Sequence, residues 1–99
     1  MKMSKSKIYK RSLLNHLRKH RKLLRYTQKD VARLLHLHDT SQICRWEKGL
    51  SLPNTTNLLK LSIIYRTFPN ELYFDLIIVL RHDVIKMEQI VFKKKNNYF

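Results

Sequence analysis

Residues 27–49, TQKDVARLLHLHDTSQICRWEKG, decide the fold that this sequence predicts. Thr27 is followed three residues later by Asp30, a spacing that forms a capping box at the start of a helix. The residues after this cap supply one apolar face over about two helical turns. They are Val31, Ala32, Leu34 and Leu35. The first half of the stretch therefore predicts a short amphipathic helix.

A second short helix is expected after the letters HLHDT, which break the apolar pattern without Gly or Pro. Asp39 or Thr40 can cap this helix. Ile43 and Trp46 are three residues apart and share one of its faces. Gly49, the only glycine of the chain, stands where a helix ends in the left-handed conformation. The link is too brief for the two helices to lie side by side in parallel.

Helical periodicity continues on both sides of this pair. A first helix is predicted from Leu13 to about Arg25. Asn54 can cap a helix downstream, and Pro69 suits the first position of a final helix. Five apolar residues in and beyond that final helix are spaced 3, 4, 3 and 4, which is a heptad pattern typical of helix pairing. They are Ile77, Leu80, Val84, Met87 and Val91. The pattern fits either dimer contacts or the core of one subunit.

Composition supports an all-α protein of one domain. The chain has 99 residues, 43% of them hydrophobic, with one Gly and two Pro, which disfavours a fold of many tight turns. A single cysteine forms no internal disulfide, so we expect a cytoplasmic protein. The basic N-terminus leads into no apolar signal segment, and the run LIIVL (76–80) is far too short to span a membrane.

Positive charge is the strongest signal in the composition: 21 Lys and Arg stand against 7 Asp and Glu, for a formal net charge of +14. Ten basic residues and no acidic residue lie within residues 1–25. Such a field attracts polyanions, and nucleic acid is the first candidate. A solubilising arm, ribosomal RNA and an anionic membrane surface fit the same charge.

The segment 17–65 resembles the Xre/Cro-type helix-turn-helix domain of bacterial and phage repressors, which has the lambda-repressor-like fold of five helices. The marks of the resemblance are Arg21, Gln28 with Ala32 four residues later, Ile43, and RWEKG at 45–49. His36 stands where the family usually has glycine. The resemblance, together with the basic and non-periodic composition of both ends, predicts three parts: a basic flexible arm (1–12), a helix-turn-helix DNA-binding domain (13–74), and an extended C-terminal helix with a basic tail (75–99).

The resemblance also implies a protein encoded by a bacterium or a phage, and it implies site residues. Helix 40–48 would enter the major groove of DNA, where the residues expected at base edges are Thr40, Ser41, Gln42, Cys44 and Arg45. The residues expected at phosphates are Thr27, Gln28, Lys29 and Lys48. Arg21 and Glu47 would form a structural ion pair. Arg45 is the sharpest of these expectations, because a guanidinium can donate two hydrogen bonds to guanine.

A metal site is the alternative interpretation of this turn, because four potential ligands, His36, His38, Asp39 and Cys44, lie within nine residues. Structural zinc takes four ligands, commonly in two close pairs, and a lone cysteine with His-x-His leaves the second pair incomplete. The sequence also lacks a close carboxylate pair, a glycine-rich phosphate loop and a Cys/His arrangement for catalysis. We therefore expect no metal, no cofactor and no enzyme activity.

The sequence thus predicts a homodimeric transcriptional regulator, repressor-like, that binds double-stranded DNA. Three alternatives stay open at this point. The first is an antitoxin module of the same fold whose C-terminal helix binds a protein partner. The second is a non-specific nucleic-acid-binding protein, and the third is a membrane-surface protein.

Overall fold

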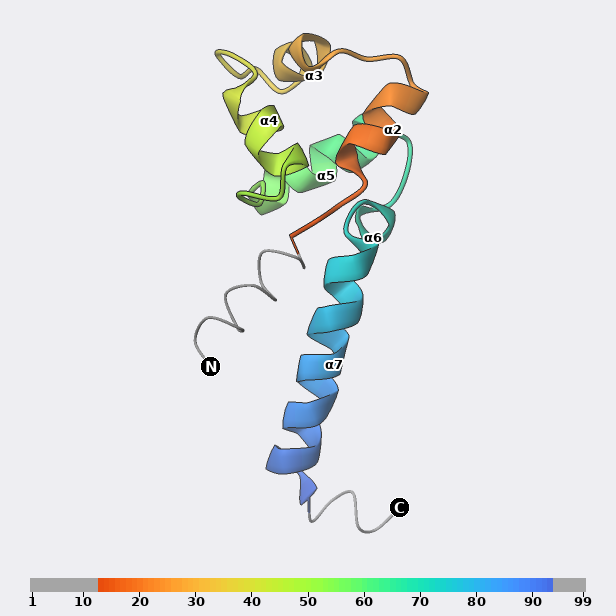
Figure 1. The fold of residues 1–99 in the computed structure, drawn as a ribbon, viewed down its shortest axis with the longest axis vertical. Coiled ribbons are helices and arrows are strands. Elements are labelled where there is room, and N and C mark those ends of the chain that lie inside the picture. Colours follow the sequence, from red (N-terminus) through yellow and green to blue (C-terminus); the bar gives the residue numbers. More distant parts are fainter. Residues whose placement is uncertain (1–12, 94–99) are drawn as a thin grey trace.

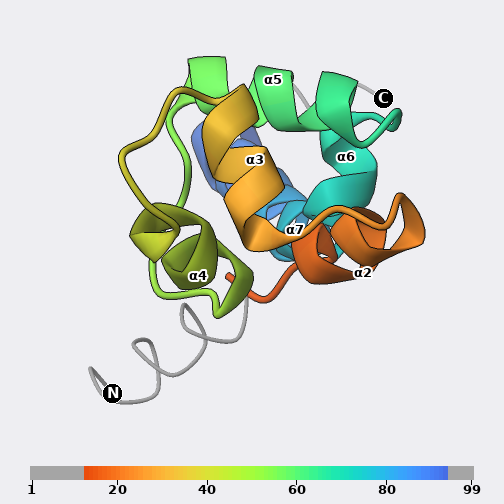
Figure 2. The same ribbon diagram turned by 90° about the horizontal axis from the view of Figure 1, so that it is seen from above.

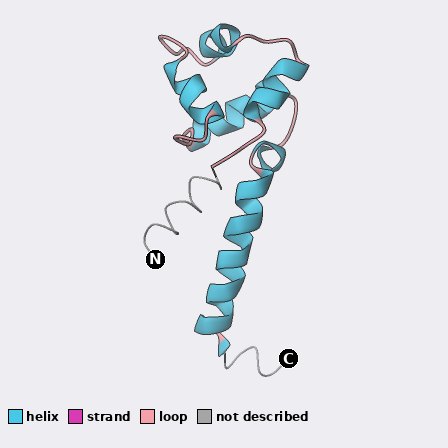
Figure 3. Cartoon of the chain, in the orientation of Figure 1, coloured by secondary structure: helices cyan, strands magenta, loops and turns pink. Residues whose placement is uncertain are grey.

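Six helices make up the regular structure of residues 13–93, the part of the chain that the computed structural model describes (Figure 3). They are α2 (Leu17–Leu23), α3 (Gln28–Leu34), α4 (Ser41–Glu47), α5 (Thr55–Ile64), α6 (Pro69–Leu72) and α7 (Phe74–Val91). No strand occurs in this range, and the predicted all-α class is confirmed. The expected arm (1–12) and residues 94–99 of the expected tail lie outside the described residues.

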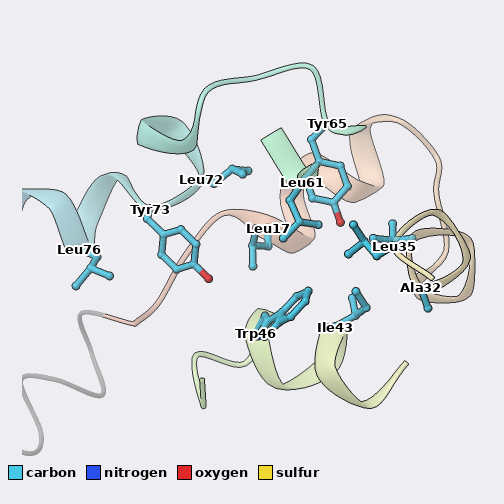
Figure 4. Packing of buried hydrophobic residues seen from close by; sticks show 11 residues of the cluster. Leu17, Ala32, Leu35, Ile43, Trp46, Leu61, Tyr65, Leu72, Tyr73 and Leu76 are labelled. Atoms are coloured by element: carbon cyan, nitrogen blue, oxygen red, sulfur yellow. The ribbon is translucent and has the colours of Figure 1, made fainter. Parts of the chain in front are cut away.

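Helices α2 to α6 surround a common interior, and α7 extends away from them (Figure 1). Viewed along α7, α3 crosses over the centre and the other short helices lie around it (Figure 2). Eleven buried hydrophobic residues fill the interior, and each of the helices α2 to α7 or its flanking turn supplies at least one of them. Ile43 and Trp46 both point from α4 into this cluster (Figure 4). Burying one such side chain stabilises the fold by about 1.5–3 kcal/mol.

The first helix is shorter than the sequence predicted, since α2 begins at Leu17 and not at Leu13. Asn15 explains the late start. Its Oδ1 accepts a hydrogen bond from the Leu17 amide at 2.9 Å, and its Nδ2 donates to the Trp46 carbonyl at 2.7 Å. The side chain of Asn15 thus replaces a helical turn and attaches the segment before α2 to the end of α4.

Four consecutive helices, α2 to α5, end in the same motif. In each, one residue takes a positive φ: Arg25 (60°), His36 (58°), Gly49 (73°) and Arg66 (54°). The amide after it then donates to a carbonyl five residues back, at 3.2, 2.8, 2.9 and 3.0 Å respectively. This is the Schellman arrangement, which satisfies carbonyls at a helix end. Three of the four positions carry a basic residue, although a side chain in this conformation costs roughly 1–2 kcal/mol.

Gly49 has a second reason to lack a side chain. A Cβ at this position would lie 3.0 Å from the carbonyl oxygen of Leu13, closer than real Cβ atoms normally approach. Since the segment of Leu13 and Asn15 crosses the end of α4 at this point, Gly49 permits both the turn and the crossing.

The predicted final helix is divided in two. Pro69 does begin a helix, but α6 ends at Leu72, and Tyr73 leaves the helical conformation with φ −125° and ψ 39°. Leu72 and Tyr73 are buried in the core, whereas α7 leaves it (Figure 1). Because of this break, α6 and Tyr73 complete the core of the domain, while α7 extends away from it. No helix within residues 13–93 is long and apolar enough to cross a membrane.

Candidate nucleic-acid interface

The helix pair predicted from residues 27–49 is formed by α3 and α4, which pack against each other. The amide of Asp30 donates to Thr27 Oγ1 at 3.0 Å, and the Thr27 amide donates to Asp30 Oδ2 at 2.8 Å. This capping box fixes the start of α3 and lowers the pKa of Asp30, because the hydrogen bonds from Thr27 favour its charged form. Ala32 is buried, and its small side chain permits α4 to approach closely.

The turn between the two helices depends on His36. Its φ of 58° is the conformation that glycine adopts most readily, and glycine is the residue usual at this place in the family that the sequence resembles. The Leu37 amide donates to the Ala32 carbonyl at 2.8 Å, so the end of α3 is satisfied with a histidine at the left-handed position. Asp39 then accepts from the Ser41 amide at 2.9 Å and begins α4. That hydrogen bond also lowers the pKa of Asp39.

The two faces of α4 differ sharply. Ile43 and Trp46 are 1% and 3% exposed and hold the helix on the core. The opposite face is open to solvent, with Thr40 and Cys44 half-buried at its margins. Its exposed residues are Ser41, Gln42, Arg45 and Lys48. The expected base-reading residues are therefore together on one accessible surface.

Arg21 and Glu47 form a bidentate ion pair between α2 and α4. Arg21 Nε donates to Glu47 Oε2 at 2.6 Å and Nη2 donates to Oε1 at 3.1 Å. Arg21 Nη1 also donates to the Tyr26 carbonyl at 2.9 Å. The hydrogen-bonded carboxylate raises the pKa of Arg21. This pair fixes the last turn of α4 relative to α2.

Gln28 belongs to the same network. Its Nε2 donates to Glu47 Oε1 at 3.0 Å, so the glutamine expected at a phosphate is attached to the end of α4. An amide nitrogen carries two hydrogens, and the second remains available for an anion. Gln28 thus links the start of α3 to the end of α4.

Arg33 is a further basic residue of this surface and lies outside the set of predicted site residues. It lines a hollow between α3 and the following loop, together with Lys29, His38, Asp39 and Thr40. Lys29 and Arg33 are exposed and four residues apart, which places them on one side of α3. That spacing was the available signal. Within residues 13–93 the ion pairs are Arg21–Glu47 and His16–Asp75, so neither basic residue of the hollow is neutralised by one.

Comparison with known families agrees with this geometry. A family model described as helix-turn-helix matches residues 17–71, more than half of the chain. The chain belongs to the helix-turn-helix family. The resemblance given by Arg21, Gln28 and the RWEKG segment is thereby confirmed, and DNA binding is the function that this family supports. Searches among curated proteins and among solved structures gave no match.

In this helix-turn-helix protein α3 is the first helix of the motif and α4 the second, which is the reading helix in such domains. Of the four potential zinc ligands, His36, His38 and Asp39 lie in the turn before α4, and Cys44 lies in the middle of α4. Within the described residues, no three His, Cys, Asp or Glu side chains lie close enough to hold a metal ion. The heptad residues of α7 lie on the projecting helix, apart from the motif (Figure 1).

Proposed function

We propose that this helix-turn-helix protein is a transcriptional regulator, repressor-like, that reads double-stranded DNA through α4. The observation that carries the proposal is the division of α4 into two faces. Ile43 and Trp46 fix one face in the core, so the other face is held rigidly toward solvent. A rigidly held helix of this kind can present its side chains to base edges in the major groove.

Arg45 is the residue we assign to specificity. It is exposed at the centre of the open face, and its guanidinium can donate to O6 and N7 of guanine, a contact that discriminates by roughly 1–3 kcal/mol. Ser41 and Gln42 precede it at the entering end of α4, with Thr40 and Cys44 at the margins.

We assign the phosphate contacts to polar and basic residues on α3 and at the end of α4. Lys29 and Lys48 are exposed, Thr27 and Gln28 stand at the start of α3, and Arg33 joins them at the adjoining hollow. Each phosphate that such a residue neutralises steepens the salt dependence of binding by about 0.9 in the log–log slope.

We also propose that the protein acts as a homodimer through α7. One helix-turn-helix domain inserts one short helix into DNA, and family members of this kind bind half-sites as dimers. The side chains proposed for the dimer contact are Ile77, Leu80, Val84, Met87 and Val91, of which the last four are exposed in the single chain.

Selection of bound fragments from random duplex DNA tests the specific function. The proposal expects one enriched motif with two related half-sites. Uniform recovery of unrelated sequences would contradict specific reading and would favour a non-specific nucleic-acid-binding protein.

An antitoxin module is the second candidate, and the exposed apolar side chains of α7 favour it. A protein partner could cover the same side chains that a second copy would cover. The two candidates separate when the protein is isolated from its native host: a regulator is recovered alone, whereas an antitoxin is recovered with a second small protein in fixed ratio.

A further inference from the structure

The outer half of α7 has no cover within the described structure. Every residue from 80 to 93 is exposed. Four heptad residues are among the exposed apolar side chains: Leu80 (42%), Val84 (56%), Met87 (54%) and Val91 (60%). Together with Ile77 they follow the helix for about 21 Å, at a rise of about 1.5 Å per residue. This stripe, Ile77 to Val91, is long enough to pair with a second helix.

Charged residues flank the stripe unequally. Arg81 and Glu88 are seven residues apart and so lie on the same flank, whereas Asp83 lies on the other flank. In paired helices, residues on these flanks meet across the interface and determine the orientation of the pair. The orientation can therefore be inferred from the sign of the charges that each arrangement brings together.

A parallel pair brings opposite flanks of the two helices together. Asp83 of each copy would then stand against Glu88 of the other copy, two carboxylates at each of two symmetric places. Like charges at such positions destabilise the pair.

An antiparallel pair brings equal flanks together. When Leu80 of one copy packs on Val91 of the other, and Val84 on Met87, Arg81 stands beside Glu88 of the other copy. Two-fold symmetry repeats this attraction at the other end of the pair. Asp83 then lies beside the apolar Ile90 and meets no carboxylate. The antiparallel arrangement therefore gains two symmetric Arg81–Glu88 attractions and avoids the repulsion between Asp83 and Glu88.

We infer that α7 binds a second copy of this chain in antiparallel orientation, with Leu80, Val84, Met87 and Val91 of the stripe as the contact and Arg81 paired with Glu88. Side chains about half exposed over about three turns, together with the residues that flank them, leave on the order of 1,000 Å² for two copies to bury, near the lower bound of specific interfaces. The two helix-turn-helix domains then lie at opposite ends of the paired helices. This inference rests on the homodimer of the proposed function.

Charge reversal distinguishes the two orientations. In an antiparallel pair Glu88→Arg places two positive side chains at each contact, and the dimer Kd, measured by analytical ultracentrifugation, is expected to rise about tenfold. In a parallel pair the same substitution turns repulsion from Asp83 into attraction, and Kd falls. Asp83→Lys is the matched control, because it changes the net charge equally. If the pair is antiparallel, Asp83→Lys is expected to change the dimer Kd by less than about twofold. If the pair is parallel, the same substitution is expected to lower Kd.

Cysteine cross-linking tests the same orientation without changing charge. In a Cys44→Ser background, copies carrying Leu80→Cys are mixed with copies carrying Val91→Cys and oxidised. A disulfide requires Cα atoms about 4.4–6.8 Å apart. Antiparallel packing brings positions 80 and 91 together, whereas position 80 of one copy lies about 16 Å along the axis from position 80 of the other. The expected product is therefore the mixed dimer.

The outcomes separate the inference from the function on which it rests. Cross-linking of Leu80→Cys with itself, or tighter association of Glu88→Arg, would overturn the antiparallel orientation and leave the homodimer standing. Sedimentation as a monomer, with and without DNA, would overturn the homodimer and this inference with it, while selection from random DNA would still decide on sequence-specific reading. Circular dichroism of each variant verifies that the domain remains folded.

Discussion

Arg21 of α2 and Glu47 of α4 form an almost fully desolvated ion pair, with Nε and Oε2 2.6 Å apart and side chains 10% and 5% exposed. Burial of two charges is costly, and the hydrogen bonds from Arg21 to the Tyr26 carbonyl and from Gln28 to Glu47 offset part of that cost. The pair therefore stabilises one particular position of α4 relative to α2. The ion pair stabilises the fold only when both charged residues and their hydrogen-bond partners are present.

Replacing Glu47 by glutamine is expected to destabilise the protein strongly. Glu47→Gln preserves the shape but leaves the buried Arg21 charge without its partner, which costs about 3 kcal/mol or more. Urea denaturation measures the loss. Asp83→Asn removes an exposed carboxylate and is expected to change the free energy of unfolding by less than about 0.5 kcal/mol.

The double variant Arg21→Met with Glu47→Met sharpens the same prediction. Since neither charge remains to be desolvated, the double variant is expected to lose less stability than Glu47→Gln alone. If the stability losses of the single variants Arg21→Met and Glu47→Met simply added up to the loss of the double variant, the two residues would not act as a coupled buried pair.

Replacing Arg45 by alanine is expected to flatten sequence discrimination. Arg45→Ala removes the two donors assigned to guanine, so affinity for the selected motif falls by about 1–3 kcal/mol while affinity for unrelated duplex falls much less. Fluorescence anisotropy at fixed salt compares the two affinities.

Arg18→Ala is the matched control for Arg45→Ala. Arg18 is an exposed arginine on α2, outside the face formed by α4, and its loss changes charge alone. We expect equal, small losses of affinity for both DNAs. A preserved sequence preference in Arg45→Ala would refute the assignment of this arginine to base reading.

Gly49 and His36 adopt the same left-handed backbone conformation. Adding a side chain at position 49 is expected to lower the free energy of unfolding, whereas removing the side chain at position 36 is expected to raise it. Gly49→Ala places a Cβ 3.0 Å from the Leu13 carbonyl oxygen at a φ of +73° and is expected to destabilise by about 1–2 kcal/mol. His36→Gly relieves the strain at φ +58° and is expected to stabilise by about 0.5–1 kcal/mol.

His38→Gly is the control for this pair of predictions. His38 is exposed and two residues further along the same turn, and it does not adopt a positive φ. Glycine there adds only freedom to the unfolded chain and is expected to destabilise slightly. Thermal melts order the three variants; stabilisation by His38→Gly to the same degree as His36→Gly would contradict an effect of backbone strain.

Local signals in the sequence predicted much of this fold. Thr27 with Asp30, Gly49 and Pro69 each act on their nearest neighbours, and the structure places a capping box, a left-handed helix end and a first helical position at them. The resemblance predicted the Arg21–Glu47 contact across 26 residues, which spacing alone does not give.

The features that the sequence did not reveal depend on contacts between distant segments. Asn15 shortens α2 by binding the carbonyl of Trp46, 31 residues away. Tyr73 ends α6 because its side chain enters the core while the chain must turn outward into α7. Arg33 joins the candidate interface only because the turn at His36 brings the start of α4 beside it. The spacing of Lys29 and Arg33 puts both residues on one side of α3, but no local pattern shows that α4 lies beside them or that Asn15 and Tyr73 contact distant segments.

The buried side chain of Tyr73 is expected to make the protein less stable at alkaline pH. Burial raises the pKa of Tyr73 to about 12, above its ordinary value of 10.0, because the charged phenolate is poorly solvated inside the protein. Since the folded-state pKa is the higher one, the unfolded chain loses its proton first. Stability is therefore fully retained below about pH 10 and falls by about 1.4 kcal/mol per pH unit, per tyrosine, up to the folded pKa. Burial raises the pKa of Tyr65 as well, so the two losses add.

Tyr73→Phe is expected to remove the part of this alkaline loss of stability that Tyr73 causes. Its hydroxyl is buried and makes no hydrogen bond within residues 13–93, so the substitution costs little at neutral pH and can stabilise by up to about 1 kcal/mol. Urea midpoints at about pH 9 and about pH 11 then differ less in Tyr73→Phe than in the parent protein, whereas Tyr26→Phe leaves the contribution of Tyr73 in place. If Tyr73→Phe and the parent declined equally between these two pH values, the buried phenol would not be a source of alkaline unfolding.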